Sequence, residues 1–222
     1  MEQLTARVLA GLSRLPADNR FIIGIVGFPG AGKSTLSGGL VDALNTVLPS
    51  PARAQIVPMD GYHLPNDVLD SLGLRDLKGI PDTFDAEGFI HLLQEIRRVP
   101  PRVLYAPAFD RSIDGSIADA ITIDTDVRVI VTEGNYLLLD DDKWRPIADL
   151  LDDCLFLDAS IETIRPRLIA RHMEGGRNLD AAIAKVESTD LPNARLIETT
   201  RSRARALVRA TAGGFHYELV AQ

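Results

Sequence analysis

The stretch Gly27-Phe28-Pro29-Gly30-Ala31-Gly32-Lys33-Ser34 fits the pattern GxxxxGK[ST] at every fixed position. The residues before it, 21–26, form a short apolar run of the kind found in buried strands, and residues 34–48 have a helical pattern. A strand, a glycine-rich turn and a helix in this order predict a loop that binds the phosphates of a nucleotide. The rest of the chain is expected to be arranged around this loop.

The residue types of the loop suit a nucleoside triphosphate. Several backbone N–H groups must point at one place, and Gly30 and Gly32 let the backbone close around the phosphates. Lys33 can bridge the β- and γ-phosphates, and the hydroxyl of Ser34 can bind the accompanying Mg²⁺. The alternative, a glycine-rich turn that binds nothing, fits the complete pattern less well. We expect ATP or GTP with Mg²⁺ here, held by Gly27, Gly30, Ala31, Gly32, Lys33, Ser34 and Thr35.

Length and charge restrict the class of protein. A chain of 222 residues can bury a sizeable core, and no linker, repeat or charge block divides it, so one domain over residues 1–222 is expected. The formal net charge of -7 argues against a general nucleic-acid-binding protein. No NKxD motif, with which GTPases read guanine, occurs in the sequence, which argues against a GTPase.

The single cysteine and the absence of an export or membrane signal predict a cytoplasmic protein. Cys154 stands in the apolar run 151–157, has no partner for an internal disulfide, and is expected to be a buried, unreactive thiol. Residues 1–15 have leucines at helical spacing with charged residues between them, which predicts an amphipathic helix and not a signal peptide. No segment approaches the roughly 20 apolar residues that span a bilayer.

Strand-like and helix-like stretches alternate along the chain. Strands are expected at 21–26, 54–59, 102–106, 117–123, 127–132, 155–158 and 215–220, and helices at 1–15, 34–48, 86–98, 140–151, 160–173, 178–187 and 193–210. Residues 107–126 are otherwise expected to be irregular, and Pro166 should lie in the first turn of its helix or kink it. The alternation predicts an α/β fold with a mainly parallel, doubly wound sheet and helices on both faces.

Four further segments carry a family resemblance. Residues 59–66 read Met-Asp-Gly-Tyr-His-Leu-Pro-Asn, residues 78–85 read Lys-Gly-Ile-Pro-Asp-Thr-Phe-Asp, residues 131–134 read Val-Thr-Glu-Gly, and Asn193 is followed by Thr-Thr-Arg-Ser-Arg-Ala at 199–204. In this order they resemble the P-loop kinases related to uridine kinase, bacterial pantothenate kinase and phosphoribulokinase, over most of the chain. The pattern is more similar still to small bacterial proteins named as nucleoside or nucleotide kinases or as fructose transport system kinases.

The resemblance implies a three-layer P-loop NTPase fold with a small lid, and an ATP-dependent phosphotransferase. The acceptor would be a hydroxyl of a small metabolite, such as a sugar, a nucleoside or a pantothenate-like compound. No nucleic-acid or membrane partner is expected, and because related kinases are often dimers, a homodimer is left open. The alternative from another class is a nucleotide-binding regulatory ATPase without a small-molecule acceptor.

Two carboxylates at expected strand ends are candidates for the chemistry. Asp60 would accept the proton of the attacking hydroxyl as general base, or alternatively would cap the turn that follows it. Glu133 would act through water on Mg²⁺ or hold the substrate, or alternatively would pair with a basic neighbour. Ser34 and Glu133 are therefore the expected metal-site residues, and Lys33 is expected to follow the γ-phosphate into the transition state.

Three arginines predict a lid over the triphosphate. Arg167 and Arg171 are four residues apart and share a helix face, and Arg177 follows the Gly175-Gly176 break. The segment of about 167–182 would be mobile without ATP and would close over it, with Arg167 on the nucleotide and Arg171 and Arg177 neutralising the transferring group. The alternative for each arginine is a solvated basic helix face.

The resemblance places the acceptor pocket at Asp60, Tyr62, His63, Asp82, Phe84, Arg111 and Glu133. For His63 a structural hydrogen bond is an alternative. Where pantothenate kinases have a substrate-facing histidine after Pro-x-Tyr, this chain has Pro-Ala-Phe-Asp-Arg at 107–111, which disfavours pantothenate and suits an acceptor with a phosphate or carboxylate. No histidine shows the spacing of a zinc ligand, and Trp144 is expected to pack in the interior.

Overall fold

A six-stranded sheet forms the centre of this computed structural model, which describes residues 1–210 and 217–220. The strands lie in the order β2, β5, β1, β6, β7, β8. The first five run parallel, and β8 pairs antiparallel with β7 at one edge. The expected mainly parallel α/β sheet is confirmed. Its strands are β1 Phe21–Gly27, β2 Arg53–Ile56, β5 Val127–Gly134, β6 Asp153–Asp158, β7 Ala206–Ala210 and β8 Tyr217–Val220.

The most buried strand carries the phosphate loop. β1 is buried along its whole length, with β5 on one side and β6 on the other. Strands covered on both faces need a continuous apolar run, and Ile23 and Ile25 of β1 are 0% exposed. Because β1 is paired on both edges and covered on both faces, it holds the first residue of the phosphate loop in a fixed position.

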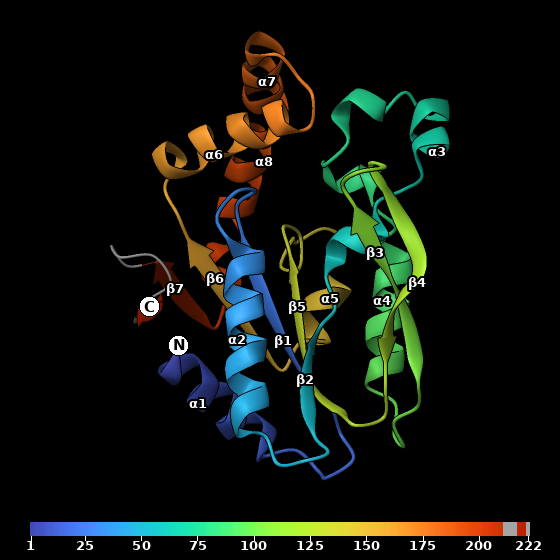
Figure 1. The fold of residues 1–222 in the computed structure, drawn as a ribbon, viewed down its shortest axis with the longest axis vertical. Coiled ribbons are helices and arrows are strands. Elements are labelled where there is room, and N and C mark those ends of the chain that lie inside the picture. Colours follow the sequence, from blue (N-terminus) through green and yellow to red (C-terminus); the bar gives the residue numbers. More distant parts are fainter. Residues whose placement is uncertain (211–216, 221–222) are drawn as a thin grey trace.

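Helices cover both faces of this sheet (Figure 1). α2 Lys33–Val47 packs on β1, β2 and β5 in front, and α5 Pro146–Asp149 lies behind the sheet in this view. The trio α6, α7 and α8 stands beyond the carboxyl ends of the strands, above the phosphate loop. The remaining bounds are α1 Glu2–Leu12, α3 Asn66–Ser71, α4 Ala86–Ile96, α6 Ile161–Glu174, α7 Leu179–Lys185 and α8 Leu191–Glu198.

A hairpin stands beside the main sheet. β3 Leu104–Asp110 and β4 Gly115–Ile123 pair antiparallel, next to α4 (Figure 1). The strands expected at 102–106 and 117–123 correspond to β3 and β4, but the expectation that the rest of 107–126 is irregular is wrong, since β3 runs on to Asp110 and β4 begins at Gly115. The first residues of β4 lack a clear signal in the sequence because nearly all their side chains are exposed.

The C-terminal region differs from the helix expected at 193–210. α8 ends at Glu198, a 3-10 turn follows at Arg201–Arg203, and β7 takes up Ala206–Ala210. β7 pairs in parallel with β6, with Val208 opposite Leu157. A short apolar run suits a helix or a strand equally well, and here the edge of β6 available for pairing decides for a strand.

Two other expected helices need correction, and a third, expected at 160–173, is confirmed as α6. Of residues 140–151 only α5, Pro146–Asp149, is α-helical, and the residues before it form turns. Pro166 lies inside α6, beyond its first turn. The helix expected at 178–187 runs on into α8 through the π-helical turn Val186–Asp190, just before Pro192, whose missing N–H interrupts the α-helical hydrogen bonding.

The amphipathic N-terminal helix is confirmed as α1, with Leu4 and Val8 buried. Of the strand expected at 215–220, β8 accounts for Tyr217–Val220, whereas Phe215 and His216 lie outside the described residues. Within the described part of the chain, no helix is long and apolar enough to cross a bilayer.

Two interior side chains lie as the sequence predicts. Cys154 is buried in β6 without a disulfide, and burial raises the pKa of its thiol, which keeps it unreactive. Trp144 is 1% exposed, and its ring packs against Phe84 and Tyr136. Both residues therefore contribute to packing.

Gly61 marks the closest approach between the turn after β2 and the hairpin. A Cβ at this position would lie 2.1 Å from the carbonyl oxygen of Pro107 in β3. We predict that Gly61→Ala lowers the free energy of unfolding by roughly 1–3 kcal/mol, because two backbone segments must separate to admit one methyl group. Urea unfolding followed by circular dichroism measures the change.

Gly38→Ala is the matched control, because Gly38 lies inside α2 and a Cβ there meets nothing within 4 Å. This substitution should leave stability unchanged or raise it by up to about 1 kcal/mol. Equal urea midpoints for Gly61→Ala and the unsubstituted protein would contradict the close approach.

Candidate active site

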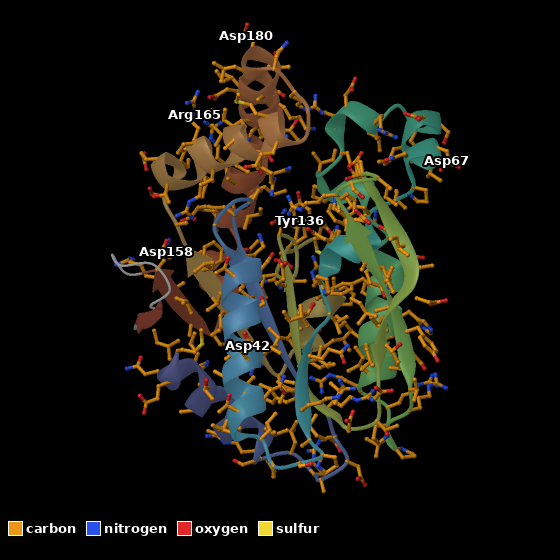
Figure 2. The ribbon with its side chains drawn as sticks, viewed as in Figure 1. Asp42, Asp67, Tyr136, Asp158, Arg165 and Asp180 are labelled. Carbon is orange, nitrogen blue, oxygen red and sulfur yellow. The ribbon has the colours of Figure 1, made fainter. Side chains whose placement is uncertain are left out.

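Three segments at the carboxyl ends of neighbouring parallel strands meet at one edge of the sheet. The phosphate loop follows β1, the 3-10 turn Met59–Tyr62 follows β2, and Glu133 stands near the end of β5. Open parallel sheets bind their ligands at this edge. In Figure 2 the side chain of Tyr136, two residues beyond β5, lies at this edge, between the α6–α8 trio and the hairpin.

The phosphate loop has the backbone that its glycines predict. Gly30 and Gly32 have φ angles of 75° and 100°, which lie in the left-handed region that only glycine adopts freely. Gly32 is also the N-cap of α2, and no side chain caps the helix. The first N–H groups of α2 are therefore available to an anion at the positive end of the helix dipole.

The side chain of Lys33 is buried and held on three sides. Its Nζ donates hydrogen bonds to the carbonyl oxygens of Gly27 at 3.0 Å and Phe28 at 3.1 Å, and to Oδ1 of Asn135 at 2.7 Å. Burial lowers the pKa of Lys33, and Glu133 opposes this shift. The ammonium group thus stays at the mouth of the loop, between β1 and the end of β5.

Ser34 and Glu133 face each other across the edge of the sheet. Ser34 Oγ donates a hydrogen bond of 2.8 Å to Glu133 Oε1. Burial raises the pKa of Glu133, and Lys33 is the main charge that opposes the rise. The basic neighbour that the sequence left open for Glu133 is therefore Lys33, which acts on it through its charge, while Ser34 donates a hydrogen bond to the same carboxylate.

The Ser34–Glu133 pair suits Mg²⁺, which prefers hard oxygen ligands and keeps several positions for water and phosphate. Among residues 1–210 and 217–220, no group of three or more His, Cys, Asp or Glu side chains could hold a metal alone. A cation held by Ser34 and Glu133 would take its other ligands from phosphate oxygens and water.

Asp60 lies inside the 3-10 turn, whose N-cap is Pro58, so the capping role that the sequence left open is not observed. Its carboxylate is half-buried and, within the described part of the chain, makes no ion pair. It is close enough to Lys33 and Glu133 to influence the pKa of both. An unpaired carboxylate among these groups is suited to accept a proton.

His63 is held in one orientation. Its Nδ1 lies 2.8 Å from the carbonyl oxygen of Asp60, to which it donates as the neutral ring's N–H, and its ring packs on Phe84 and Phe109 at centroid distances of 4.0 and 4.6 Å. Burial lowers the pKa of His63, which favours this neutral form. The predicted structural hydrogen bond is present, and Nε2 is left as an acceptor.

The other residues of the predicted acceptor pocket differ in exposure. Phe84 is only 2% exposed and its ring packs against that of His63, so Phe84 supports His63 from the interior and is not itself accessible to a ligand. Tyr62 is half-buried against Phe89, and burial raises its pKa. Asp82 is exposed on the 3-10 turn Pro81–Thr83.

Two of the three lid arginines face the site. Arg167 Nη1 donates to the carbonyl oxygen of Gly30 at 3.3 Å, which brings α6 against the phosphate loop. Arg171 lies 3.8 Å from Asp190, and burial lowers its pKa, with Asp60 among the nearby charges. Arg177 is exposed beyond Gly176, so the structure does not bring it to the other two.

The structure narrows the segment that could open as a lid. Leu168 of α6 is 0% exposed, and His172 Nε2 lies 2.6 Å from Asp190 Oδ2. These contacts anchor α6 through residue 172, whereas Gly176 has a φ angle of 92° and no side chain near it. Residues 173–181 are all exposed, whereas Ala182 of α7 is again 0% exposed, so the stretch between the two helices is the part of the predicted lid that can move without loss of buried contacts.

Sequence reasoning missed two partners in the site. Asn135 binds Lys33, and Asp190, 7% exposed on the π-helical turn, pairs with His172. A polar residue directly after the strand-end Glu-Gly pair was a signal for Asn135. The pairing of Asp190 with His172 has no local signal, since the two residues are 18 apart in the sequence and lie on different elements.

The arginine segment at 201–203, which carries part of the family resemblance, is engaged in structural contacts. Arg201 makes a two-pronged ion pair with Asp158 at 2.7 and 3.0 Å, and Arg203 donates to the carbonyl oxygen of Leu138 at 2.7 Å. These arginines join the turn after α8 to the ends of β6 and β5.

Comparison with known proteins gives one consistent result. No protein-family model matches the chain. A Schizosaccharomyces pombe protein named "Putative uridine kinase C227.14" is 34% identical over 190 residues, or 83% of this chain and 80% of that protein. The pantothenate kinase of Limosilactobacillus reuteri is 29% identical over 215 residues, or 87% and 69%.

Among solved structures, the "putative fructose transport system kinase" of Silicibacter sp. TM1040 is 38% identical with a TM-score of 0.82. The match covers 94% of this chain and 98% of that one. The similarity therefore extends over nearly the full length of both chains.

Proposed function

The chain belongs to the P-loop kinases related to uridine kinase and pantothenate kinase, and from that membership we propose that it transfers the γ-phosphoryl group of ATP to a hydroxyl of a small metabolite. The observation that carries the proposal is the meeting of Lys33, Asp60 and Glu133 at one edge of the sheet. These are the cation, base and metal-side carboxylate that phosphoryl transfer needs.

The nucleotide side of the site is built by the phosphate loop. Backbone N–H groups at the start of α2 bind the phosphates, and Lys33 places a positive charge beside the transferring group. Ser34 and Glu133 would hold Mg²⁺, which when bound neutralises phosphate charge. Gly27, Ala31 and Thr35 complete the proposed nucleotide contacts, and Arg167 approaches them from α6.

Asp60 is the proposed general base. The acceptor hydroxyl loses its proton to the Asp60 carboxylate as its oxygen forms a bond to the γ-phosphorus, and the bond from that phosphorus to ADP breaks. Asp60 is half-buried and makes no ion pair with any residue that the structure describes, which leaves its carboxylate free for this exchange. Tyr62, His63 and Asp82 are proposed to contact the acceptor, with Phe84 supporting His63 from behind.

The lid is proposed to exclude water. Arg171, near Asp60, would neutralise charge on the transferring phosphoryl group, and Arg177 would join it when the segment after Gly175 closes. We propose one kinase domain over residues 1–222, with the lid at about 167–182. The cytoplasmic location and the homodimer stay predictions.

The second candidate is a regulatory ATPase without an acceptor. A kinase must bind a small molecule beside Asp60, and the free Nε2 of His63 together with the exposed Arg111 favours such a ligand. A screen of sugars, nucleosides and vitamin precursors for acceptor-dependent ADP release separates the two. Turnover that is slow and independent of every acceptor would favour the regulatory ATPase.

Lys33→Ala should lower kcat by about 100-fold or more, because it removes the charge that follows the γ-phosphate. A coupled assay of ADP release measures this, with Lys143→Ala, an exposed lysine remote from the loop, as control. If Lys33→Ala folds and keeps normal kinetics, the loop is not the active site.

Asp60→Asn should lower kcat by about 100- to 10,000-fold, since an amide has the same shape but cannot take the proton. ATP affinity, measured by calorimetry, should stay nearly the same. Asp67→Asn, on exposed α3, serves as the control for a lost surface charge. Weaker ATP binding with unchanged kcat would assign Asp60 a structural role instead.

Hydrogen exchange should slow in residues 167–182 when a non-hydrolysable ATP analogue and Mg²⁺ are added, most strongly from Gly175 onward. Arg171→Ala should lower kcat more than it weakens ATP binding. Arg165→Ala is the control on the same helix, because Arg165 pairs with Glu187 at the surface. Slow exchange in the nucleotide-free protein together with a silent Arg171→Ala would exclude a moving lid.

A further inference from the structure

Arg111 stands at the tip of the β3–β4 hairpin without a partner for its charge. It is exposed, and within the described residues its guanidinium makes no hydrogen bond or ion pair. Two carboxylates in the same turn have other partners: Asp110 accepts from the N–H and hydroxyl of Ser112, and Asp114 pairs with Lys78 at 3.1 Å. Both carboxylates of the turn are thus bound by groups other than Arg111, which leaves its guanidinium free.

The hairpin turn that carries Arg111 lies beside the candidate site. Ser116, opposite Phe109 in the hairpin, donates from its Oγ to the carbonyl oxygen of His63 at 3.4 Å. The positive charge of Arg111 is also close enough to Arg171 to add to the lowering of its pKa, which follows mainly from burial. Arg111 therefore carries its charge close to the site.

The hairpin brings Arg111 to the side of the site that is proposed to hold the acceptor. The hairpin lies on the opposite side of the phosphate loop from α6, which carries the arginine that contacts Gly30 (Figure 1). Arg167 and Arg171 on α6 can serve the nucleotide from their side. The charge of Arg111 is then available to the second substrate.

The position of Arg111 relative to Asp60 is fixed by backbone contacts. Gly61, next to Asp60, packs directly on the carbonyl of Pro107 in β3. At the tip, Lys78 Nζ donates to Asn66 Oδ1 at 2.8 Å and pairs with Asp114, which ties the turn to α3. The backbone segments that carry the general base and the free arginine are therefore held at a fixed spacing, which can select a ligand by the distance between its groups.

The surface between the two groups suits a hydroxylated compound. Phe109, two residues before Arg111, is half-buried and packs on the ring of His63. His63 donates its Nδ1–H to Asp60, so Nε2 can accept a hydrogen bond from a second hydroxyl. An apolar ring with one hydrogen-bond acceptor matches a carbon chain that carries more than one hydroxyl.

We infer that the acceptor carries an anionic group, a phosphate or a carboxylate, which Arg111 binds while Asp60 holds the hydroxyl that is phosphorylated. A guanidinium matches either anion through two parallel hydrogen bonds. The inference rests on the proposed kinase activity. The product would then be a metabolite with a new phosphate ester in addition to its original anionic group.

The test compares matched acceptors that differ only in charge. ADP release is measured for a series of sugars, the monophosphate of each and the corresponding sugar acid. We expect kcat/KM to be about 10- to 100-fold higher for an anionic member than for its neutral parent, the range for hydrogen bonds to charged groups. Comparison of the sugar monophosphates with the sugar acids shows whether a phosphate or a carboxylate is preferred.

Variants of Arg111 link the preference to this residue. Arg111→Gln should lower kcat/KM for the anionic member, mainly through KM, by at least 10-fold more than for the neutral parent, so that the advantage of the anionic member is lost, while Arg111→Lys should keep part of it. Arg145→Gln, which alters a surface ion pair with Asp140, is the control and should change neither.

Two outcomes would overturn the inference, and they differ from failure of the kinase proposal. Equal kcat/KM for neutral and anionic members, or an unchanged preference in Arg111→Gln, refutes the role of Arg111 and leaves the kinase activity intact. Absence of transfer to every member of the series, with ATP turnover unaffected by Lys33→Ala, refutes the proposed kinase and this inference with it.

Discussion

The site depends on the parallel pairing of β5 with both β1 and β2. This pairing sets Glu133 opposite Ile25 of β1, so that the end of β5 stands beside the phosphate loop. The hydrogen bonds from Ser34 to Glu133 and from Lys33 to Asn135 then join the two strand ends. Because the strands are buried and hydrogen-bonded along their length, these side chains cannot shift without breaking the sheet. Such rigidity provides the preorganised charges that phosphoryl transfer requires.

The charged residues at this edge fall into two groups: those in ion pairs that hold elements together, and those without an ion pair. Arg201 is bound in two places by Asp158, and His172 by the buried Asp190, so these pairs hold elements together. Asp60 and Arg111, in contrast, make no ion pair within the described part of the chain. A partly buried charge such as that of Asp60 is costly when unpaired, and a bound ligand can offset that cost. Arg111 is exposed and carries no such cost, so its charge is available to an anion at the proposed acceptor site.

Glycine makes the close approach between the site and the hairpin possible. The turn that carries Asp60 touches β3 through Gly61, and Gly134 at the end of β5 lies where a Cβ would come 2.7 Å from Met59. With no side chain at either position, the turn after β2 is enclosed by β5 and by the hairpin. The candidate base is thereby placed by backbone packing, which tolerates less variation than contacts between flexible side chains.

By itself the sequence determined the phosphate loop, the parallel sheet and the edge at which Asp60 and Glu133 lie. These follow from local patterns: a contiguous motif, short apolar runs, and the rule that parallel strands end on the same side. The pairing of β3 with β4, the strand at Ala206–Ala210 and the contacts that bind Lys33 and His172 were decided by the tertiary structure. Lys33 and Asn135 are 102 residues apart, so the sequence does not show that they pair. The freedom of Arg111 is of the same kind, because it depends on where the neighbouring carboxylates find their partners in three dimensions.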